Sequence, residues 1–303
     1  MLTTKICNVK LDNPTVLASG IMGVTGASLC FVAENGAGAV TTKSIGLDER
    51  KGHPAPVVLE WEKGLINAVG LSSPGIDEGV EELKIAVENC QSPVIASIFA
   101  PTAKQFGKVT KQVSKARPAL IEANISCPNV EAEFGKPFGT DSEVSAKVTR
   151  IVKKNSKCPV IVKLSPNVSN IKLIAQAVQK AGADAICAIN TVGPGMIIDI
   201  KTGKPLLSNK VGGLSGPAIK PVAVRCVYDI YDAVKIPIIG TGGITYGGDA
   251  IEMIMAGATA VGIGSGVHYR GIDVFKKVCE EIAQFMEKEG YNKLKDLRGV
   301  AHD

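Results

Sequence analysis

The chain is predicted to fold as a parallel (β/α)8 barrel of the TIM-barrel class, because eight short apolar segments alternate with longer amphipathic ones from about residue 15 onward. Each apolar segment is uncharged over most of its length and is closed by Ser, Thr, Asn or Gly, as expected for buried parallel strands. An open, doubly wound sheet is the alternative. The eight predicted strands are residues 15–20, 37–44, 93–100, 120–126, 160–165, 185–191, 236–243 and 260–266.

Helical periodicity lies between the strands and is clearest over residues 143–155, 171–182 and 248–257. The last two segments end in glycine, a common helix stop. Residues 3–14 are expected to form a hairpin across the bottom of the barrel.

Two stretches, residues 45–76 and 192–215, exceed a minimal barrel. Both are rich in Gly, Pro and polar residues, and both follow strand ends. These ends form the active-site face of a barrel, so we expect the insertions to cover a ligand on the C-terminal face. No composition shift marks a domain boundary, and residues 1–303 are predicted to form a single barrel domain.

The composition excludes several classes of protein. The net charge of +5 comes from scattered lysines without a basic block, which argues against nucleic-acid binding. No two of the eight cysteines have C-x2-C spacing and there are only three histidines, so no metal site is expected. The chain shows no signal peptide and no apolar run of membrane-spanning length, which predicts a soluble cytoplasmic protein without a membrane partner.

The last two predicted strands end in glycine clusters, Gly240–Gly243 and Gly262–Gly266, each followed by a helical segment. In a barrel these loops form a ready phosphate site, because free backbone N–H groups point at the anion. Tight turns alone are the alternative. Neither cluster matches G-x-G-x-x-G, so a mononucleotide such as FMN fits better than a dinucleotide.

Two lysines, Lys43 and Lys163, lie at the ends of apolar strands. A buried lysine is costly unless it meets a negative charge or an acceptor, so both are expected to face an anionic ligand at the barrel mouth. Either one alone could instead extend to solvent. A cation beside a flavin ring would stabilise the charge that develops on reduction.

Four asparagines mark the same face: Asn67, Asn124, Asn129 and Asn190. An amide offers a donor and an acceptor, which matches a ring with alternating N–H and C=O groups. Each of them taken alone could equally be a turn or cap residue.

Cys127 follows the fourth predicted strand, and Pro128 disfavours a helical backbone at this cysteine. No histidine lies nearby in sequence to form a Cys–His nucleophile pair. A thiol that accepts a proton is therefore favoured over one used for acyl transfer, and a structural cysteine is the alternative.

Four motifs carry a resemblance that covers nearly the whole chain. NISCPNV (124–130), VKLSPNV (162–168), GGLSGPAIKPVAVR (212–225) and IPIIGTGGI (236–244) resemble, in the same order, those of the class 1 dihydroorotate dehydrogenases. NISCPNV together with GGLSGPAIKP is highly specific, whereas the glycine clusters alone are not.

The resemblance implies that Cys127 removes the C5 proton of dihydroorotate while hydride leaves C6 for N5 of FMN. Ser97 stands where that family commonly has an asparagine near FMN, so no flavin contact is assigned to it. The implied substrate residues are Lys43, Asn67, Ala68, Val69, Gly70, Leu71, Asn124, Asn129, Asn190 and Thr191. The implied FMN residues are Ser19, Lys43, Ser44, Asn124, Lys163, Ile189, Gly216, Gly242, Gly243, Gly264 and Ser265.

The segment 189–221 looks most like class 1B, whose members work with a partner subunit that carries FAD and an iron–sulfur centre. This implies oxidation of (S)-dihydroorotate to orotate in de novo pyrimidine (UMP) biosynthesis, with electrons passed to NAD through the partner. It also implies a homodimer of catalytic chains within a heterotetramer. The fumarate-using class 1A differs in this segment, and the membrane-associated class 2 enzymes use serine as the base and carry an N-terminal extension.

Two other functions remain open from the sequence. One is a related flavin barrel of the dihydropyrimidine dehydrogenase type, and the other is a non-catalytic phosphate-binding barrel. Residues 130–140, which follow the turn at Cys127, contain two glycines and a proline and are expected to act as a lid over the site. A static surface loop is the alternative.

Overall fold

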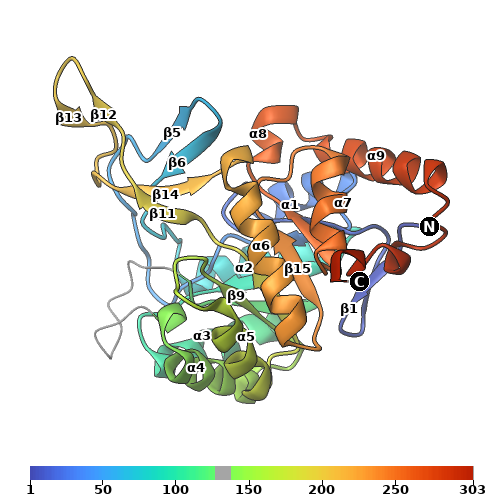
Figure 1. The fold of residues 1–303 in the computed structure, drawn as a ribbon. Helices are drawn as coiled ribbons and strands as arrows, with labels where there is room; N and C mark the ends of the chain where they lie inside the picture. The colour runs from blue at the N-terminus through green and yellow to red at the C-terminus, as the bar shows by residue number, and fades with distance from the viewer. Residues whose placement is uncertain (127–137, 303) are drawn as a thin grey trace.

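A computed structural model describes residues 1–126 and 138–302, and its centre is a closed barrel of eight parallel strands (Figure 1). The barrel prediction is confirmed, and the open doubly wound sheet is wrong. Around the barrel the order is β10-β15-β16-β3-β4-β7-β8-β9. The strands are β3 (Thr15–Leu17), β4 (Ala39–Thr41), β7 (Val94–Ile98), β8 (Leu120–Asn124), β9 (Val160–Leu164), β10 (Ala185–Ala188), β15 (Ile238–Thr241) and β16 (Ala260–Ile263).

Each strand lies within its predicted range, and most end before that range does. The polar and glycine residues that close the predicted ranges have mostly left the hydrogen-bonded ladder. They form the loops at the mouth of the barrel, where backbone and side chains are free to contact a ligand.

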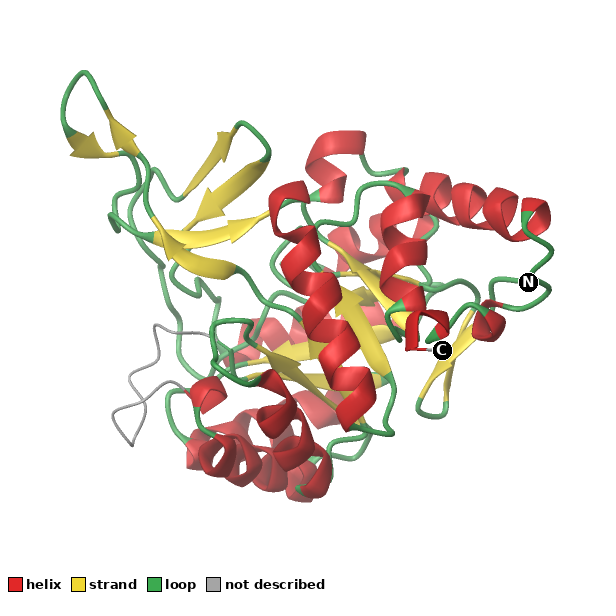
Figure 2. Ribbon diagram, viewed as in Figure 1, coloured by secondary structure: helices red, strands yellow, loops and turns green. Residues whose placement is uncertain are grey.

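Helices cover the outside of the barrel, and the three helices predicted most clearly are confirmed (Figure 2). Gly182 and Gly257, just past two of them, have φ of +100° and +120°, which is the left-handed conformation that stops a helix. No described helix is long and apolar enough to cross a membrane. The helices are α1 (Gly26–Glu34), α2 (Ile76–Asn89), α3 (Ala103–Val113), α4 (Ser142–Asn155), α5 (Ile171–Lys180), α6 (Lys220–Ala233), α7 (Gly247–Met255), α8 (Gly266–Arg270) and α9 (Val274–Lys288), with short 3-10 turns at Ser114–Ala116, Phe138–Thr140, Pro217–Ile219, Leu294–Asp296 and Val300–His302.

The N-terminal hairpin, β1 (Thr4–Ile6) and β2 (Val9–Leu11), closes the bottom of the barrel as predicted. Ile6 and Leu11 are almost wholly buried and share an apolar cluster with inward-facing strand residues. A second, larger cluster lies between the strands and the surrounding helices. Burial of the hairpin in the first cluster seals the lower end, so the only described mouth is at the C-terminal ends of the strands.

The two insertions pair with each other, although the sequence did not predict strands in them. Their strands β5 (Val58–Trp61), β6 (Gly64–Asn67), β11 (Val192–Gly195) and β14 (Gly212–Ser215) form an antiparallel sheet of order β11-β14-β6-β5. The short hairpin of β12 (Ile198–Asp199) and β13 (Lys204–Pro205) projects beyond this sheet (Figure 1). Glycine and proline obscure the alternation that usually reveals a strand, so pairing between distant segments decides the structure here.

Candidate active site

A cavity of about 300 Å³ lies at the mouth of the barrel, between the strand ends and the insertion sheet. Its size is at the lower end of the range for small-molecule sites in proteins. Seven of the eight barrel strands or the loops after them contribute to its wall, and β5, β6 and β14 contribute from the insertions. The insertions therefore cover the C-terminal face, as the sequence predicted.

Every predicted site residue that the structure describes lines this one cavity. Cys127 and Asn129 lie outside the described residues, as do residues 130–137 of the expected lid. The predicted residues in the wall are Ser19, Lys43, Ser44, Asn67, Ala68, Val69, Gly70, Leu71, Asn124, Lys163, Ile189, Asn190, Thr191, Gly216, Gly242, Gly243, Gly264 and Ser265.

The two predicted lysines both face the cavity. Lys163 is only 5% exposed and lies in register with Asn124 on β8 and Cys187 on β10. Lys43 follows β4, and burial lowers the pKa of its ammonium. Among the described residues, neither ammonium lies within 4 Å of a carboxylate. Two partly desolvated cations without described counter-charges favour an anionic ligand.

Two of the predicted asparagines are joined by hydrogen bonds. The Asn190 amide nitrogen donates to Ser126 Oγ at 2.6 Å, and Ser126 Oγ donates to Asn124 Oδ1 at 2.7 Å. The Asn124 amide nitrogen donates in turn to Ser44 Oγ at 3.2 Å. Asn67, at the end of β6, approaches the cavity from the insertion sheet, where its amide nitrogen donates to the Gly213 carbonyl at 3.4 Å. Amide groups therefore line the cavity from both the barrel and its cover.

Ser97 is wholly buried beneath the cavity and does not line it. Its hydroxyl donates to Glu122 Oε1 at 3.0 Å and lies 2.9 Å from Ser44 Oγ. Ser97 is thus a supporting residue and not a part of the cavity wall.

At the glycine loops, the backbone itself forms part of the cavity wall. Gly216, Gly242 and Gly243 have positive φ, and a Cβ at Gly243 would come within 2.9 Å of the Lys220 backbone nitrogen. Gly264 differs, because its φ lies outside the left-handed region and an added Cβ would meet no described atom closer than 3.6 Å. Neither backbone strain nor packing within the described protein requires glycine at position 264. The backbone at Gly264 is therefore open toward the cavity and could be approached closely by a ligand.

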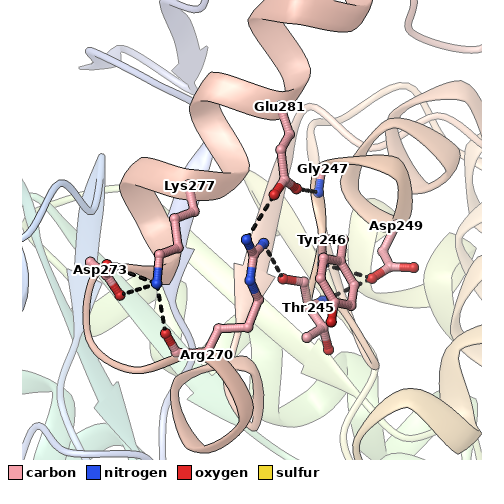
Figure 3. A network of polar contacts seen from close by, with 8 residues as sticks. All are labelled: Thr245, Tyr246, Gly247, Asp249, Arg270, Asp273, Lys277 and Glu281. Atoms are coloured by element: carbon pink, nitrogen blue, oxygen red, sulfur yellow. Dashed lines mark hydrogen bonds and ion pairs between the residues drawn. The ribbon is translucent and has the colours of Figure 1, made fainter.

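A network of polar contacts holds the two glycine loops relative to each other (Figure 3). Arg270, at the end of α8, donates to the Thr245 carbonyl at 3.1 Å and to Glu281 Oε1 at 2.8 Å. Glu281 also accepts from the backbone N–H of Gly247 at the start of α7, and the guanidinium of Arg270 lies 4.5 Å from the centre of the Tyr246 ring. These contacts therefore join the loops after β15 and β16 through residues that do not line the cavity.

Several wall and supporting residues were missed by sequence reasoning. Ser126 and Ser215 lie inside the motifs NISCPNV and GGLSGPAIKPVAVR, so these motifs could have identified both residues. Glu122, a carboxylate in an apolar strand, gave the same signal as the two lysines. The further wall residues are Ala18, Gly20, Ile21, Val58, Leu65, Ser72, Ser215, Ile219, Thr241 and Gly262.

Together the fold and the cavity define a (β/α)8-barrel protein with a cavity at its mouth whose lysines suit an anionic ligand. Residues 1–286 match the family model described as dihydroorotate dehydrogenase. The chain therefore belongs to the dihydroorotate dehydrogenase family.

Curated relatives support the same assignment. A protein of Methanocaldococcus jannaschii is 48% identical over 306 residues, covering 100% of this chain and 99% of its own. Proteins of Methanosarcina mazei (48% identical, 98% and 94% covered) and Methanothermobacter thermautotrophicus (46% identical, 100% and 99% covered) are similar. All three are named "Dihydroorotate dehydrogenase B (NAD(+)), catalytic subunit". The resemblance to class 1B is confirmed by these relatives.

Proposed function

We propose that this chain oxidises (S)-dihydroorotate to orotate in pyrimidine biosynthesis, with FMN held in the cavity at the barrel mouth. The observation that carries the proposal is the gathering of Lys43, Lys163, Asn124 and Asn190 around one cavity in a chain of this family. Dihydroorotate is a carboxylate on a ring of alternating N–H and C=O groups, which suits lysines and amides.

The residues present fit a flavin mononucleotide. Gly242, Gly243, Gly264 and Ser265 would hold its phosphate, since the open backbone at Gly264 leaves room that the described protein does not fill. Lys163 would lie beside the ring system, where a cation offsets negative charge. When bound, FMN supplies the hydride acceptor for the reaction.

The remaining chemistry falls to the protein's own side chains. Cys127 would take the proton from C5 while the C6–H electron pair leaves as hydride, so that the C5=C6 double bond of orotate forms. Lys43 would hold the carboxylate, and Asn67, Asn124, Asn129 and Asn190 would orient the ring. Thr191 and the backbone of 68–71 would complete the substrate wall.

The role of Cys127 is tested by Cys127→Ser. The free thiol has a pKa of about 8.5, so flavin reduction is expected to accelerate as pH rises through thiol ionisation. The variant should still bind orotate, while flavin reduction near neutral pH slows by roughly two or more orders of magnitude. Stopped-flow absorbance measures both. Reduction at the wild-type rate would show that another group is the base.

A flavin barrel acting on other pyrimidines is the second candidate. Orotate differs from uracil by the carboxylate that we assign to Lys43, so the two ligands separate the candidates directly. Orotate should perturb the flavin spectrum at concentrations where uracil does not, and the reverse preference would favour the second candidate.

Electrons would leave FMN through a partner subunit that carries FAD and an iron–sulfur centre. The names of the relatives, which specify both NAD and a catalytic subunit, support this route. Since the barrel mouth serves the substrate, the partner would dock elsewhere, and two catalytic chains would pair within a heterotetramer. Each chain would act as a single barrel domain in the cytoplasm.

A further inference from the structure

We propose that Glu122, a carboxylate beneath the cavity, orients the amides of Asn124 and Asn190 through a chain of hydrogen bonds that runs in one direction. Glu122 lies on β8, is only 3% exposed and is not part of the cavity wall. The inference rests on the proposed function, because it takes those two amides as the groups that bind the substrate ring.

The direction is set first at Glu122. A carboxylate only accepts hydrogen bonds, so the Ser97 hydroxyl proton is committed to Glu122 Oε1 at 3.0 Å. Ser44 Oγ lies 2.9 Å from Ser97 Oγ and 3.4 Å from Ser19 Oγ, whose own proton goes to the Thr42 carbonyl, so Ser44 donates to Ser97 as the nearer acceptor. Because its own proton is spent, Ser44 can accept from Asn124 but cannot donate to it.

The same direction continues through both amides. Asn124 Nδ2 donates to Ser44 at 3.2 Å, which places Asn124 Oδ1 where it accepts from Ser126 Oγ at 2.7 Å. Ser126 Oγ accepts in turn from Asn190 Nδ2 at 2.6 Å. Each hydroxyl in the chain thus donates once and accepts once.

The contact at the Asn190 end of the hydrogen-bond chain independently supports the same direction. The backbone N–H of Thr191, which can only donate, lies 2.8 Å from Asn190 Oδ1. The Asn190 oxygen is therefore on that side and its nitrogen faces Ser126. An obligate donor at one end and an obligate acceptor at the other specify a single orientation for both amides.

The consequence for the cavity is a defined pattern of donors and acceptors. Each amide uses one N–H and one lone pair within the chain, and the second of each remains for a ligand. Without the Glu122 acceptor, the buried Ser97 hydroxyl turns to Ser44 Oγ, 2.9 Å away, and displaces the Ser44 proton toward Asn124 or the more distant Ser19 Oγ. If the direction of donation reverses, the side-chain amides of Asn124 and Asn190 must flip, so that nitrogen and oxygen change places. If it does not reverse, a buried donor is left without a partner.

The test compares two substitutions at position 122 in the flavin-loaded protein. Glu122→Met has similar length and no acceptor, whereas Glu122→Gln keeps a carbonyl oxygen that can accept from Ser97. We expect Glu122→Met to weaken orotate binding by roughly tenfold to a hundredfold, and Glu122→Gln to stay within a few-fold of wild type. The flavin absorbance change on titration with orotate measures the Kd, and KM for dihydroorotate should rise with Kd.

A second variant separates the chain from a merely structural role. Ser97→Ala cuts the chain at its next link and should weaken orotate binding as Glu122→Met does, with no further loss in the double variant. This variant also carries the test if Glu122→Met does not fold. Thr110→Val is the matched control and should bind orotate normally, because it removes a buried hydroxyl on α3 that bonds, among the described residues, only to the Phe106 carbonyl.

Three outcomes count against the proposal. Wild-type orotate binding by Glu122→Met or by Ser97→Ala overturns it, and additive losses in the double variant overturn the shared chain. Equal losses of orotate affinity in Glu122→Met and Glu122→Gln would show that the negative charge of Glu122 matters and that the direction of the hydrogen bonds does not. Failure of the flavin-loaded wild-type protein to bind orotate would instead reject the proposed function before any variant is compared.

Discussion

At the scale of the single residue, the cavity depends on charges held away from water. Lys43 is half-buried and Lys163 almost wholly buried, and no described carboxylate lies within ion-pairing distance of either. Burying a charge without a partner costs free energy. The free protein carries that cost, and an anionic ligand at this site would relieve it.

Because Lys43 can lose its proton, orotate affinity is expected to depend on pH. Burial lowers the pKa of Lys43 in the free protein, and an adjacent orotate carboxylate would raise it, because an opposite charge favours the ammonium. Orotate affinity should therefore be full below the lowered pKa and should fall as pH rises through it toward the pKa in the complex. Titrations in the Cys127→Ser background exclude thiol ionisation as a cause.

Lys43→Met is the control for that titration. It should bind orotate more weakly at neutral pH, by roughly tenfold or more, and should lose the alkaline fall in affinity. An unchanged alkaline fall in Lys43→Met would assign the titration to another group.

At the scale of the element, the loops after β15 and β16 form a backbone cradle at the cavity. The hydrogen bonds of Arg270 and Glu281 hold the two loops together (Figure 3). Gly264 faces the cavity from this cradle, and nothing described within the protein requires the absence of a side chain there. The proposed FMN phosphate would lie in this space, against the backbone.

Gly264→Ala tests the cradle. The free energy of unfolding of the flavin-free protein should change by less than about 1 kcal/mol, because the added methyl group meets no described atom closer than 3.6 Å. FMN binding should weaken by roughly tenfold or more, because the methyl group occupies ligand space. Flavin fluorescence titration and urea unfolding measure the two quantities.

Gly248→Ala is the matched control. Gly248 lies in the first turn of α7, and an added Cβ there meets nothing within 4 Å. It should bind FMN normally, and equal FMN binding by both variants would remove the cradle from the phosphate site.

Some of the strands could be predicted from the sequence alone, and others could not. The barrel strands were predictable because each is a short apolar run that is buried on both faces. β11 and β14 were not, because VGPG and GGLS contain no alternating pattern, and they become strands only by pairing across the insertions. Many of the wall residues were predicted from motifs, but the Ser97 and Glu122 contacts depend on neighbouring strands that are distant in sequence.

At the scale of the whole molecule, the cavity exists only in the assembled fold. Its wall draws on barrel strands from both ends of the chain and on two insertions that pair through β6 and β14. The sequence contains no dinucleotide fingerprint, so we expect this chain to hold no NAD site of its own.

The isolated chain should therefore be unable to use NAD. With dihydroorotate as substrate it should reduce an artificial dye and form no NADH, because the FAD and iron–sulfur partner is missing. Robust NADH formation by the isolated chain would contradict the partner model, and strong turnover with fumarate would indicate class 1A behaviour.

The central claim is tested most directly by adding dihydroorotate, without oxygen, to the purified flavin-loaded chain while recording its visible absorption spectrum. We expect the yellow flavin band to bleach, with one orotate formed for each flavin reduced. A protein that takes up no FMN, or a flavin band that dihydroorotate leaves unchanged, would contradict the account.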